Sequence, residues 1–114
     1  MLAKKFKLTG AKDFDRVQKT GKVFQSTNFG IAFVAREDTN PSRFAFIVST
    51  KIAKEAVDRN RAKRAMSEAV RINSVNLVPG YDVVFLAKTT IARISTTEIM
   101  KEVFLALKEA GLAK

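Results

Sequence analysis

The stretch that constrains the fold most is a basic segment that reads Val57-Asp58-Arg59-Asn60-Arg61-Ala62-Lys63-Arg64-Ala65-Met66-Ser67-Glu68-Ala69-Val70-Arg71. At about 100° per residue, a helix through this segment gathers polar side chains three and four residues apart into one stripe. The stripe consists of Asn60, Lys63, Arg64, Ser67 and Arg71, and the opposite, apolar face consists of Ala62, Ala65, Met66, Ala69, Val70 and Ile72. The pattern predicts a helix that packs on a core through one face and presents cations with the other.

Two interpretations of this cationic face remain open at the level of pattern. It suits an RNA or DNA phosphate backbone, but an ordinary solvated charged face has the same composition. Glu68 lies four residues after Arg64 and would neutralise one charge in an i,i+4 pair.

The charge of the chain favours a polyanionic partner. Its 114 residues hold 21 Lys and Arg against 11 Asp and Glu, a net charge of +10. The sequence pI of about 10.2 falls in the range of nucleic-acid-binding domains. Residues 1–22 carry seven basic and two acidic side chains, and residues 51–71 carry seven and three. The surplus is therefore concentrated in two stretches, and the rest is expected to be neutral scaffold.

Composition also excludes some kinds of site. The chain has no histidine, which removes the commonest general base and metal ligand, and no cysteine, which removes disulfides and thiolate metal sites. No run approaches the roughly 18 apolar residues of a membrane span, and no apolar segment follows the basic amino terminus. We therefore expect a cytoplasmic protein with no membrane partner. Without repeats or linkers, residues 1–114 are expected to form a single RNA-binding domain.

The first half of the chain is expected to form a helix followed by strands. A helix over residues 11–20 ends at Gly21, and extended segments follow at residues 23–24, 28–35 and 43–49. The last two segments alternate bulky and small residues and are expected to pair as a hairpin through a turn at residues 38–42. A helix should cover the bulky face, whereas the small face either lines a shallow groove or simply meets solvent.

The second half adds a strand and a closing helix to the basic helix. Val78-Pro79-Gly80 forms a turn into a strand over residues 81–87, whose continuous apolar run is typical of an interior strand. Ser95-Thr96-Thr97-Glu98 matches a capping box, after which apolar residues recur at helical spacing as far as Gly111. The predicted fold class is therefore α/β, with the order α-β-β-β-α-β-α.

This order, together with Arg-Asn-Arg-x-Lys-Arg at residues 59–64, resembles the protein subunit of bacterial ribonuclease P over nearly the whole chain. Further similar positions are Phe6-Lys7-Leu8, Asp13-Phe14-Asp15-Arg16-Val17 with Gly21, Phe29, Arg43, Val48-Ser49, Lys51, Glu68 and Gly80-Tyr81-Asp82-Val83-Val84. Four positions depart from the family's pattern, namely Gln18, Ala32, Thr50 and Ser67. These departures weaken the distal part of the basic face and the expected stacking of bases.

The resemblance implies a non-catalytic subunit of a ribozyme holoenzyme, the endoribonuclease that removes the 5′ leader from precursor tRNA. In that family the catalytic RNA subunit performs the hydrolysis with divalent ions such as Mg²⁺, held mainly by RNA, and the protein binds both the catalytic RNA and the leader. The implied fold is a single compact α/β sandwich with a mixed sheet and a left-handed βαβ crossover, an exception to the usual hand. The leader is expected in a cleft between the sheet and the first helix.

These implications define the expected site. The RNA-binding residues are Arg59, Asn60, Arg61, Lys63, Arg64, Lys51 and Arg71, and the leader-binding candidates are Phe14, Lys12, Ala32 and Ile47. Arginine matches phosphate oxygens with a planar fork, and lysine supplies an adaptable point charge. For Phe14, core packing is an equal alternative.

No catalytic residue and no protein metal ligand is expected. The acidic pairs Asp13/Asp15 and Glu37/Asp38 are interpreted as solvated surface acids. A ribosomal or RNA-chaperone protein without a ribozyme partner remains the alternative function, whereas an independent nuclease would need a catalytic cluster that the sequence does not offer.

Overall fold

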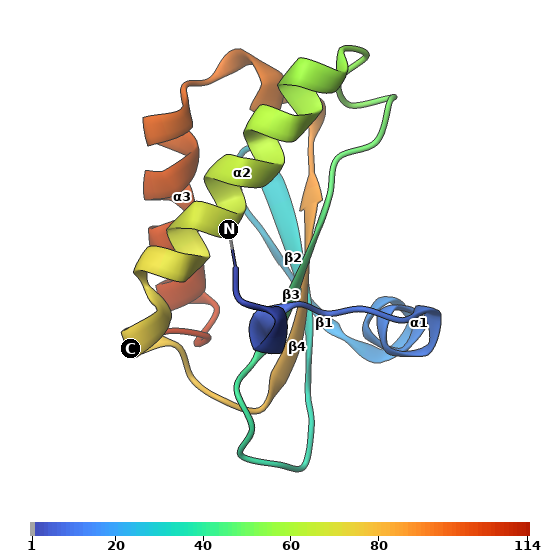
Figure 1. Ribbon diagram of the computed structural model, residues 1–114, viewed down its shortest axis with the longest axis vertical. Coiled ribbons are helices and arrows are strands. Elements are labelled where there is room, and N and C mark those ends of the chain that lie inside the picture. The colour runs from blue at the N-terminus through green and yellow to red at the C-terminus, as the bar shows by residue number, and fades with distance from the viewer. Residues whose placement is uncertain (1) are drawn as a thin grey trace.

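The computed structural model describes residues 2–114 as a four-stranded mixed sheet with helices on both faces (Figure 1). The strands are β1 (Lys22–Gln25), β2 (Phe29–Ala35), β3 (Arg43–Ile47) and β4 (Tyr81–Ala87), and the helices are α1 (Ala11–Thr20), α2 (Ala56–Ile72) and α3 (Thr96–Glu109). Short 3-10 turns occupy Lys4–Phe6, Ser74–Asn76 and Thr89–Arg93. The predicted fold class and order of elements are confirmed. No helix within residues 2–114 has the length and apolar character needed to cross a membrane.

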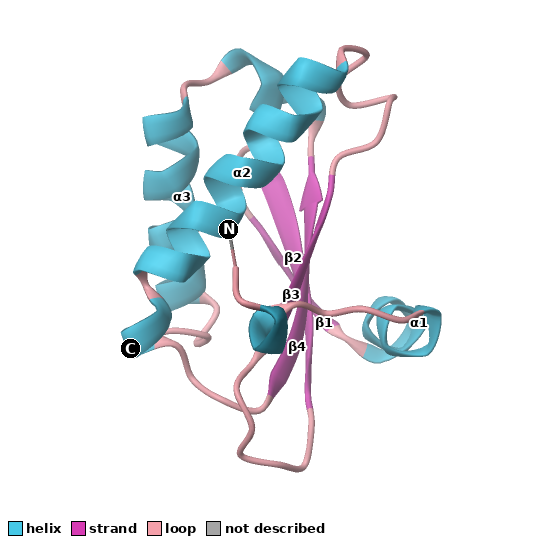
Figure 2. Cartoon of the chain, viewed as in Figure 1, coloured by secondary structure: helices cyan, strands magenta, loops and turns pink. Residues whose placement is uncertain are grey.

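The two faces of the sheet carry different layers (Figure 2). Helices α2 and α3 cover the face that presents the bulky residues of the strands, and the main core forms there around Phe29, Ile31, Met66 and Phe85. Helix α1 covers the face of small residues, where Leu8, Val17, Ala32 and Val84 form a second, smaller core. The predicted alternation therefore places the bulky strand residues in the main core under α2 and α3, and the small ones in the smaller core under α1.

The apolar face of α2 is buried as predicted, with one exception. Ala62, Ala65, Met66, Ala69 and Val70 are buried, but Ile72 is 52% exposed. The expectation that Ile72 is buried is wrong. Ile72 lies at the edge of the apolar face, about 20° around the helix axis from the buried Ala65, and it is the last residue of α2, so the core covers it only in part.

The sheet has the strand order β1-β2-β4-β3. Strand β4 pairs antiparallel with β2, with Phe29 opposite Ala87, and parallel with β3, with Phe44 opposite Val83. The predicted hairpin of residues 28–35 with residues 43–49 is therefore wrong, because β4 lies between them. The run from Asp82 to Phe85 is buried, and a strand buried on both faces belongs at the centre of a sheet. β2 forms its hairpin with β1 instead.

Helix α2 connects β3 to β4, two parallel and adjacent strands. This unit is the crossover that the resemblance describes as left-handed. On the outer edge of β3, the N-terminal segment forms a parallel bridge between Lys7 and Phe44, in which the Leu8 N–H donates to the Phe44 carbonyl at 2.8 Å. The N-terminal segment is thereby fixed beside α2.

The helix ends follow their sequence signals. The Glu98 N–H donates to the Ser95 hydroxyl oxygen at 3.2 Å, which confirms the predicted cap of α3. A Cβ atom at Gly21, just after α1, would lie 2.4 Å from the Val17 carbonyl oxygen, so the chain can leave the helix here only without a side chain. These caps fix where α1 and α3 stand against the sheet.

Candidate nucleic-acid interface

The outer face of α2 carries four cations and one amide that we call the α2 basic surface: Arg59, Asn60, Arg61, Lys63 and Arg64. Asn60, Lys63 and Arg64 are exposed, as the polar stripe predicted. The side chains of Lys63 and Arg64 form no ion pair within residues 2–114. Because the opposite face of the helix is locked in the core, these two charges are held outward with no carboxylate to neutralise them.

Arg71, at the end of the same stripe, is neutralised. Its Nε donates to Glu68 Oε2 at 3.0 Å and its Nη2 to Oε1, three residues apart on the helix. This pairing lowers the pKa of Glu68. The expected pair of Glu68 with Arg64 is therefore wrong, since the acid turns to the arginine on the next turn. The free positive charge shifts to the first half of α2.

Arg59 and Arg61 are half-buried and have a structural task that sequence reasoning missed. Arg59 Nη1 donates to the carbonyl oxygens of Ala53 at 2.9 Å and Lys54 at 2.7 Å, on the loop before α2. Arg61 donates to the carbonyl oxygens of Ile94 at 3.0 Å and Ala92 at 3.2 Å, on the segment between β4 and α3. Both tie neighbouring loops to the helix. Helical spacing already places both outside the polar stripe that contains Arg64, but it does not indicate which groups they contact.

The leader-binding candidates lie on the other side of the sheet and divide into three groups. Lys12 on α1 is exposed and Ile47 at the end of β3 is 36% exposed. Phe14 is half-buried and packs against the smaller core, which agrees with the packing alternative, whereas its contact with the leader stays a prediction. Ala32 is only 3% exposed beneath α1. The expectation that Ala32 contacts a ligand is corrected by its place in that core.

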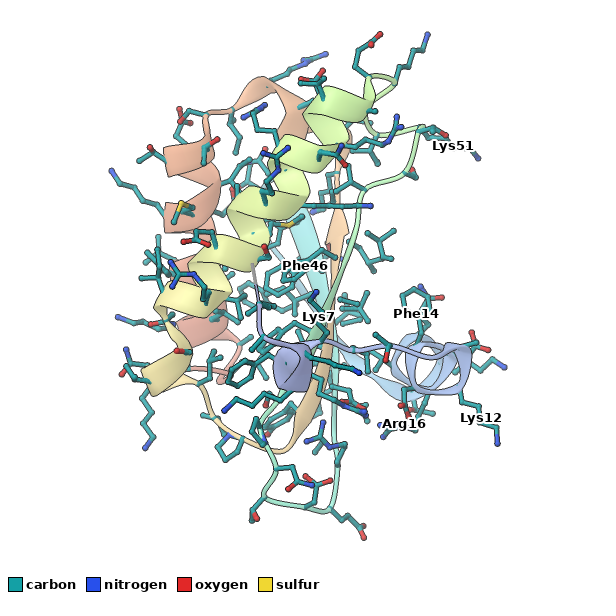
Figure 3. The ribbon with its side chains drawn as sticks, viewed as in Figure 1. Lys7, Lys12, Phe14, Arg16, Phe46 and Lys51 are labelled. Atoms are coloured by element: carbon teal, nitrogen blue, oxygen red, sulfur yellow. The ribbon has the colours of Figure 1, made fainter. Side chains whose placement is uncertain are left out.

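The structure does not bring all expected residues together (Figure 3). Lys12 and Phe14 extend from α1 on one side of the sheet, whereas Lys51 lies on the loop before α2, near the end of that helix where the α2 basic surface begins. The expected residues therefore form two groups, one on α2 and the loop before it, and one on α1 and the strands β2 and β3.

A buried carboxylate at the start of β4 holds three arginines that the sequence did not connect. Asp82 is 0% exposed and accepts from Arg43 Nε and Nη2, each at 2.9 Å, and from Arg36 Nη1 and Arg16 Nη2. Burial raises the pKa of Asp82, but the hydrogen bonds and charges of Arg43 and Arg36 lower it further, so this pKa lies below its ordinary value. Arg16 thereby ties α1 to the central strand. In the sequence, the only sign of this site was an acid, Asp82, directly before the apolar run of residues 83–87.

Two other acids also pair with these arginines but stay at the surface. Asp13 lies 3.3 Å from Arg43 Nη2, and Asp38 accepts from Arg36 Nε at 3.0 Å. Their side chains are 39% and 37% exposed, so they are surface acids as expected, with arginine partners that the sequence did not indicate. No group of three or more acidic side chains that could hold a metal ion occurs among residues 2–114.

An α/β sheet with helices on both faces that displays unpaired cations on the exposed side of one helix is the kind of surface that a small RNA-binding protein presents. The family model for ribonuclease P matches residues 2–111 of the chain. The chain therefore belongs to the ribonuclease P protein family, the RNA-binding subunits of the RNA-based enzyme that processes the 5′ ends of transfer RNAs.

Individual relatives agree with this membership. The ribonuclease P protein component of Clostridium kluyveri is 38% identical over 104 residues, which cover 90% of this chain and 91% of the relative. That of Caldanaerobacter subterraneus is 34% identical over 112 residues, covering 98% and 95%.

Among solved structures, the RNase P protein of Staphylococcus aureus shares the fold with a TM-score of 0.87 at 23% identity, covering 96% of this chain and 98% of that one. The RNase P protein of Thermotoga maritima has a TM-score of 0.80 at 25% identity, covering 90% and 96%. The resemblance found in the sequence is confirmed.

Proposed function

We propose that this chain assists a catalytic RNA subunit in removing the 5′ leader from precursor tRNA, and that the RNA performs the chemistry. The observation that carries the proposal is the pair of unpaired cations, Lys63 and Arg64, on a helix whose other face is fixed in the core. No carboxylate partner has to be displaced before these two charges can neutralise phosphates. We propose the cytoplasm as the place of action, since precursor tRNA is made there in bacteria.

On the α2 basic surface each residue type has a distinct part. The Arg64 guanidinium binds phosphate oxygens in a bidentate fashion, and Lys63 adds a mobile point charge. Asn60 both donates and accepts, which suits a ribose hydroxyl or a base edge. Arg59 and Arg61 offer the N–H groups that the loop carbonyls leave over, because a guanidinium has five. Lys51 extends the surface along the preceding loop.

For the leader we propose the side of α1. Lys12 supplies a phosphate contact, Phe14 a partly exposed ring for base stacking, and Ile47 an apolar contact at the end of β3. Arg71, on α2, contributes little to the binding of the catalytic RNA, because Glu68 already neutralises its charge.

The divalent ion is assigned to the RNA. Asp13, Asp38 and Asp82 each face an arginine, and a carboxylate so engaged is a poor Mg²⁺ ligand. The residues present thus do not fit a protein-held Mg²⁺ site, and the proposal routes no step through one.

Reconstitution with a bacterial catalytic RNA tests the proposal. The protein alone, purified free of RNA, should leave precursor tRNA uncut at all Mg²⁺ concentrations, whereas its addition should lower the Mg²⁺ concentration that the catalytic RNA requires. Cleavage by the protein alone that survives controls for contaminating ribonuclease would contradict it. An unchanged Mg²⁺ requirement with intact RNA binding would favour the alternative, an RNA chaperone without a ribozyme partner.

Salt dependence tests the leader contacts separately. If about four phosphates are neutralised, the logarithm of affinity for a single-stranded leader should fall against the logarithm of salt concentration with a slope of roughly −3. An affinity that stays constant from low to physiological salt would show that the leader is not held by charge.

A further inference from the structure

A cavity of about 310 Å³ opens at the outer edge of β3, between this strand, the N-terminal segment and α2. Its apolar lining comes from Leu2, Leu8, Phe44, Ala45 and Phe46, and its polar lining from Lys7, Thr9, Lys63, Arg64 and Ser67. The volume lies at the lower end of the range for pockets that enclose a small ligand. We call this cavity the β3-edge pocket. It adjoins the α2 basic surface at the edge of the sheet, and its lining residues Leu8 and Ala45 also belong to, or pack against, the smaller core beneath α1.

The apolar lining includes a ring that is held in place. Phe46 is half-buried, and its ring centroid lies 5.2 Å from that of the buried Phe85. Figure 3 shows Phe46 on the side of the sheet that faces α2, with Lys7 close by on the N-terminal segment. A fixed, partly exposed ring offers a stacking surface without a further loss of side-chain freedom.

The strand edge adds polar groups to this apolar lining. β3 pairs with β4 on one side only, and on its outer side the Phe44 carbonyl accepts from Leu8. Backbone groups of alternate residues point to the same edge of a strand, so those of Phe46 face the pocket. Within residues 2–114 they make no hydrogen bond on this side. An unpaired N–H beside an unpaired C=O matches the donor and acceptor pattern of a nucleobase edge.

The charges at the pocket select the kind of ligand. Lys7, Lys63 and Arg64 form no ion pair within the described part of the chain, and they come from two separate elements. An apolar lining surrounded by cations fits a group with a flat apolar ring and flanking negative charge. A nucleotide has this chemistry.

We propose that the β3-edge pocket receives one unpaired nucleotide of the catalytic RNA, with its base against Phe46 and its neighbouring phosphates on Lys7, Lys63 and Arg64. The proposal rests on the proposed function and refines it. The catalytic RNA is chosen over the leader because the pocket shares Lys63 and Arg64 with the α2 basic surface, whereas the leader candidates lie on the opposite face.

The test compares matched variants in fluorescence titrations with the catalytic RNA and, separately, with a single-stranded leader oligonucleotide. Phe46→Leu removes the ring but keeps apolar volume, and its control is Phe24→Leu, a half-buried phenylalanine on the other edge strand. Lys7→Gln removes one exposed charge, and its control is Lys108→Gln on the outer side of α3. Thermal melts accompany every variant, and Lys7→Gln remains informative if Phe46→Leu is destabilised.

We expect Phe46→Leu to weaken binding of the catalytic RNA by about 5- to 10-fold, the lower end of the loss expected for one stacked base. Lys7→Gln should weaken it and reduce the salt slope by about one. Both control variants should bind as the unchanged protein does. Catalytic RNA that carries 4-thiouridine should cross-link to residue 46 at one position.

Two results would overturn the proposal while leaving the proposed function standing. In the first, Phe46→Leu and Lys7→Gln bind the catalytic RNA normally while Arg64→Ala still weakens binding. In the second, the two variants lose affinity for the leader oligonucleotide only, which would give the pocket a different occupant. Normal binding by Arg64→Ala as well would instead contradict the role of the α2 basic surface itself.

Discussion

The arginines on the two sides of the sheet lie in opposite electrostatic environments. Around Asp82, Arg16 and Arg43 meet a buried carboxylate that offsets part of their positive charge. On α2, Arg61 meets only backbone carbonyls and Arg64 meets no carboxylate among residues 2–114. Arg16 belongs to the basic stretch of residues 1–22, and Arg61 and Arg64 belong to that of residues 51–71. The difference teaches that net charge along the sequence locates surplus cations, whereas the fold decides which of them can bind RNA.

The largest expected effect comes from removing the carboxylate that neutralises the first group. Asp82→Asn removes the buried counter-charge that Arg16, Arg36 and Arg43 share, leaving only the partly exposed Asp13 and Asp38 beside them, and should lower the free energy of unfolding by about 3 kcal/mol. Chemical denaturation measures this loss. Asp15→Asn, at an exposed acid on α1, is the matched control and should change stability little. Equal stability of both variants would mean that the arginines do not depend on Asp82.

The same group should respond to acid. Because the pKa of Asp82 is lowered in the folded state, its ionised form stabilises the protein at neutral pH, and this stabilisation is lost as the pH falls below about 4 towards the lowered pKa. In Asp82→Asn the corresponding part of the acid-induced loss should be absent. A pH profile of the free energy of unfolding that is parallel in both proteins would rule out this linkage.

The next effect separates the buried and exposed faces of α2. Met66→Ala opens a cavity in the main core, because Met66 is fully buried, and should cost about 2 to 4 kcal/mol of stability with RNA affinity of the folded fraction unchanged. Ile72→Ala, at the partly exposed end of the same helix, should cost less than about 0.5 kcal/mol. Thermal melts and RNA titrations on both variants decide. A large loss of RNA affinity in folded Met66→Ala would contradict the division between faces.

Within the α2 basic surface, substitutions of Arg61 and Arg64 should differ in their effect on stability. Arg61→Ala removes hydrogen bonds to the carbonyls of Ala92 and Ile94 and should cost about 1 to 2 kcal/mol of stability, besides weakening RNA binding. Arg64→Ala should weaken RNA binding while stability changes by less than about 0.5 kcal/mol. Arg61 thus differs from an ordinary exposed cation, whose removal costs little stability. Identical melting temperatures for the two variants would show that its carbonyl contacts do not stabilise the fold.

The smallest effect should follow from releasing Arg71. Glu68→Gln removes the carboxylate that holds Arg71, so RNA affinity should rise by about twofold to fivefold and the salt slope should steepen by about 0.7 to 1. Arg71→Gln, the matched variant, should leave affinity nearly as it is, since its charge is already neutralised. Weaker binding by Glu68→Gln would show that the ion pair itself positions the helix for RNA.

The local pattern of the sequence was sufficient for most of the fold. Periodicity placed α1, α2 and α3, and the apolar run after Gly80 correctly indicated an interior strand. The pairing of strands was not predictable in this way. The hairpin expected between residues 28–35 and 43–49 relied on their closeness in the chain. In the structure β4, about 40 residues later, pairs with both β2 and β3, and its buried residues place it between them.

The candidate site was predictable only in its exposed part. The stripe of Asn60, Lys63 and Arg64 followed from helical spacing alone. The carbonyl contacts of Arg61 and the arginines around Asp82 join segments distant in sequence, so no local pattern encodes them. Ala32 was misplaced for the same reason, since only the docking of α1 reveals that it is covered.

The central position of β4 has a consequence for synthesis of the chain. Within the four-stranded sheet β3 pairs with β4, its outer edge carrying an isolated bridge to Lys7, and the β1–β2 hairpin also relies on β4 for its second edge. While the ribosome has released only residues before Tyr81, the growing chain can form one two-stranded hairpin, which is marginally stable by itself. Its apolar strands and the cations of α2 therefore emerge before the element that arranges them. Nascent chains should stay sensitive to protease until residues 81–87 have left the exit tunnel and then gain protection in one step.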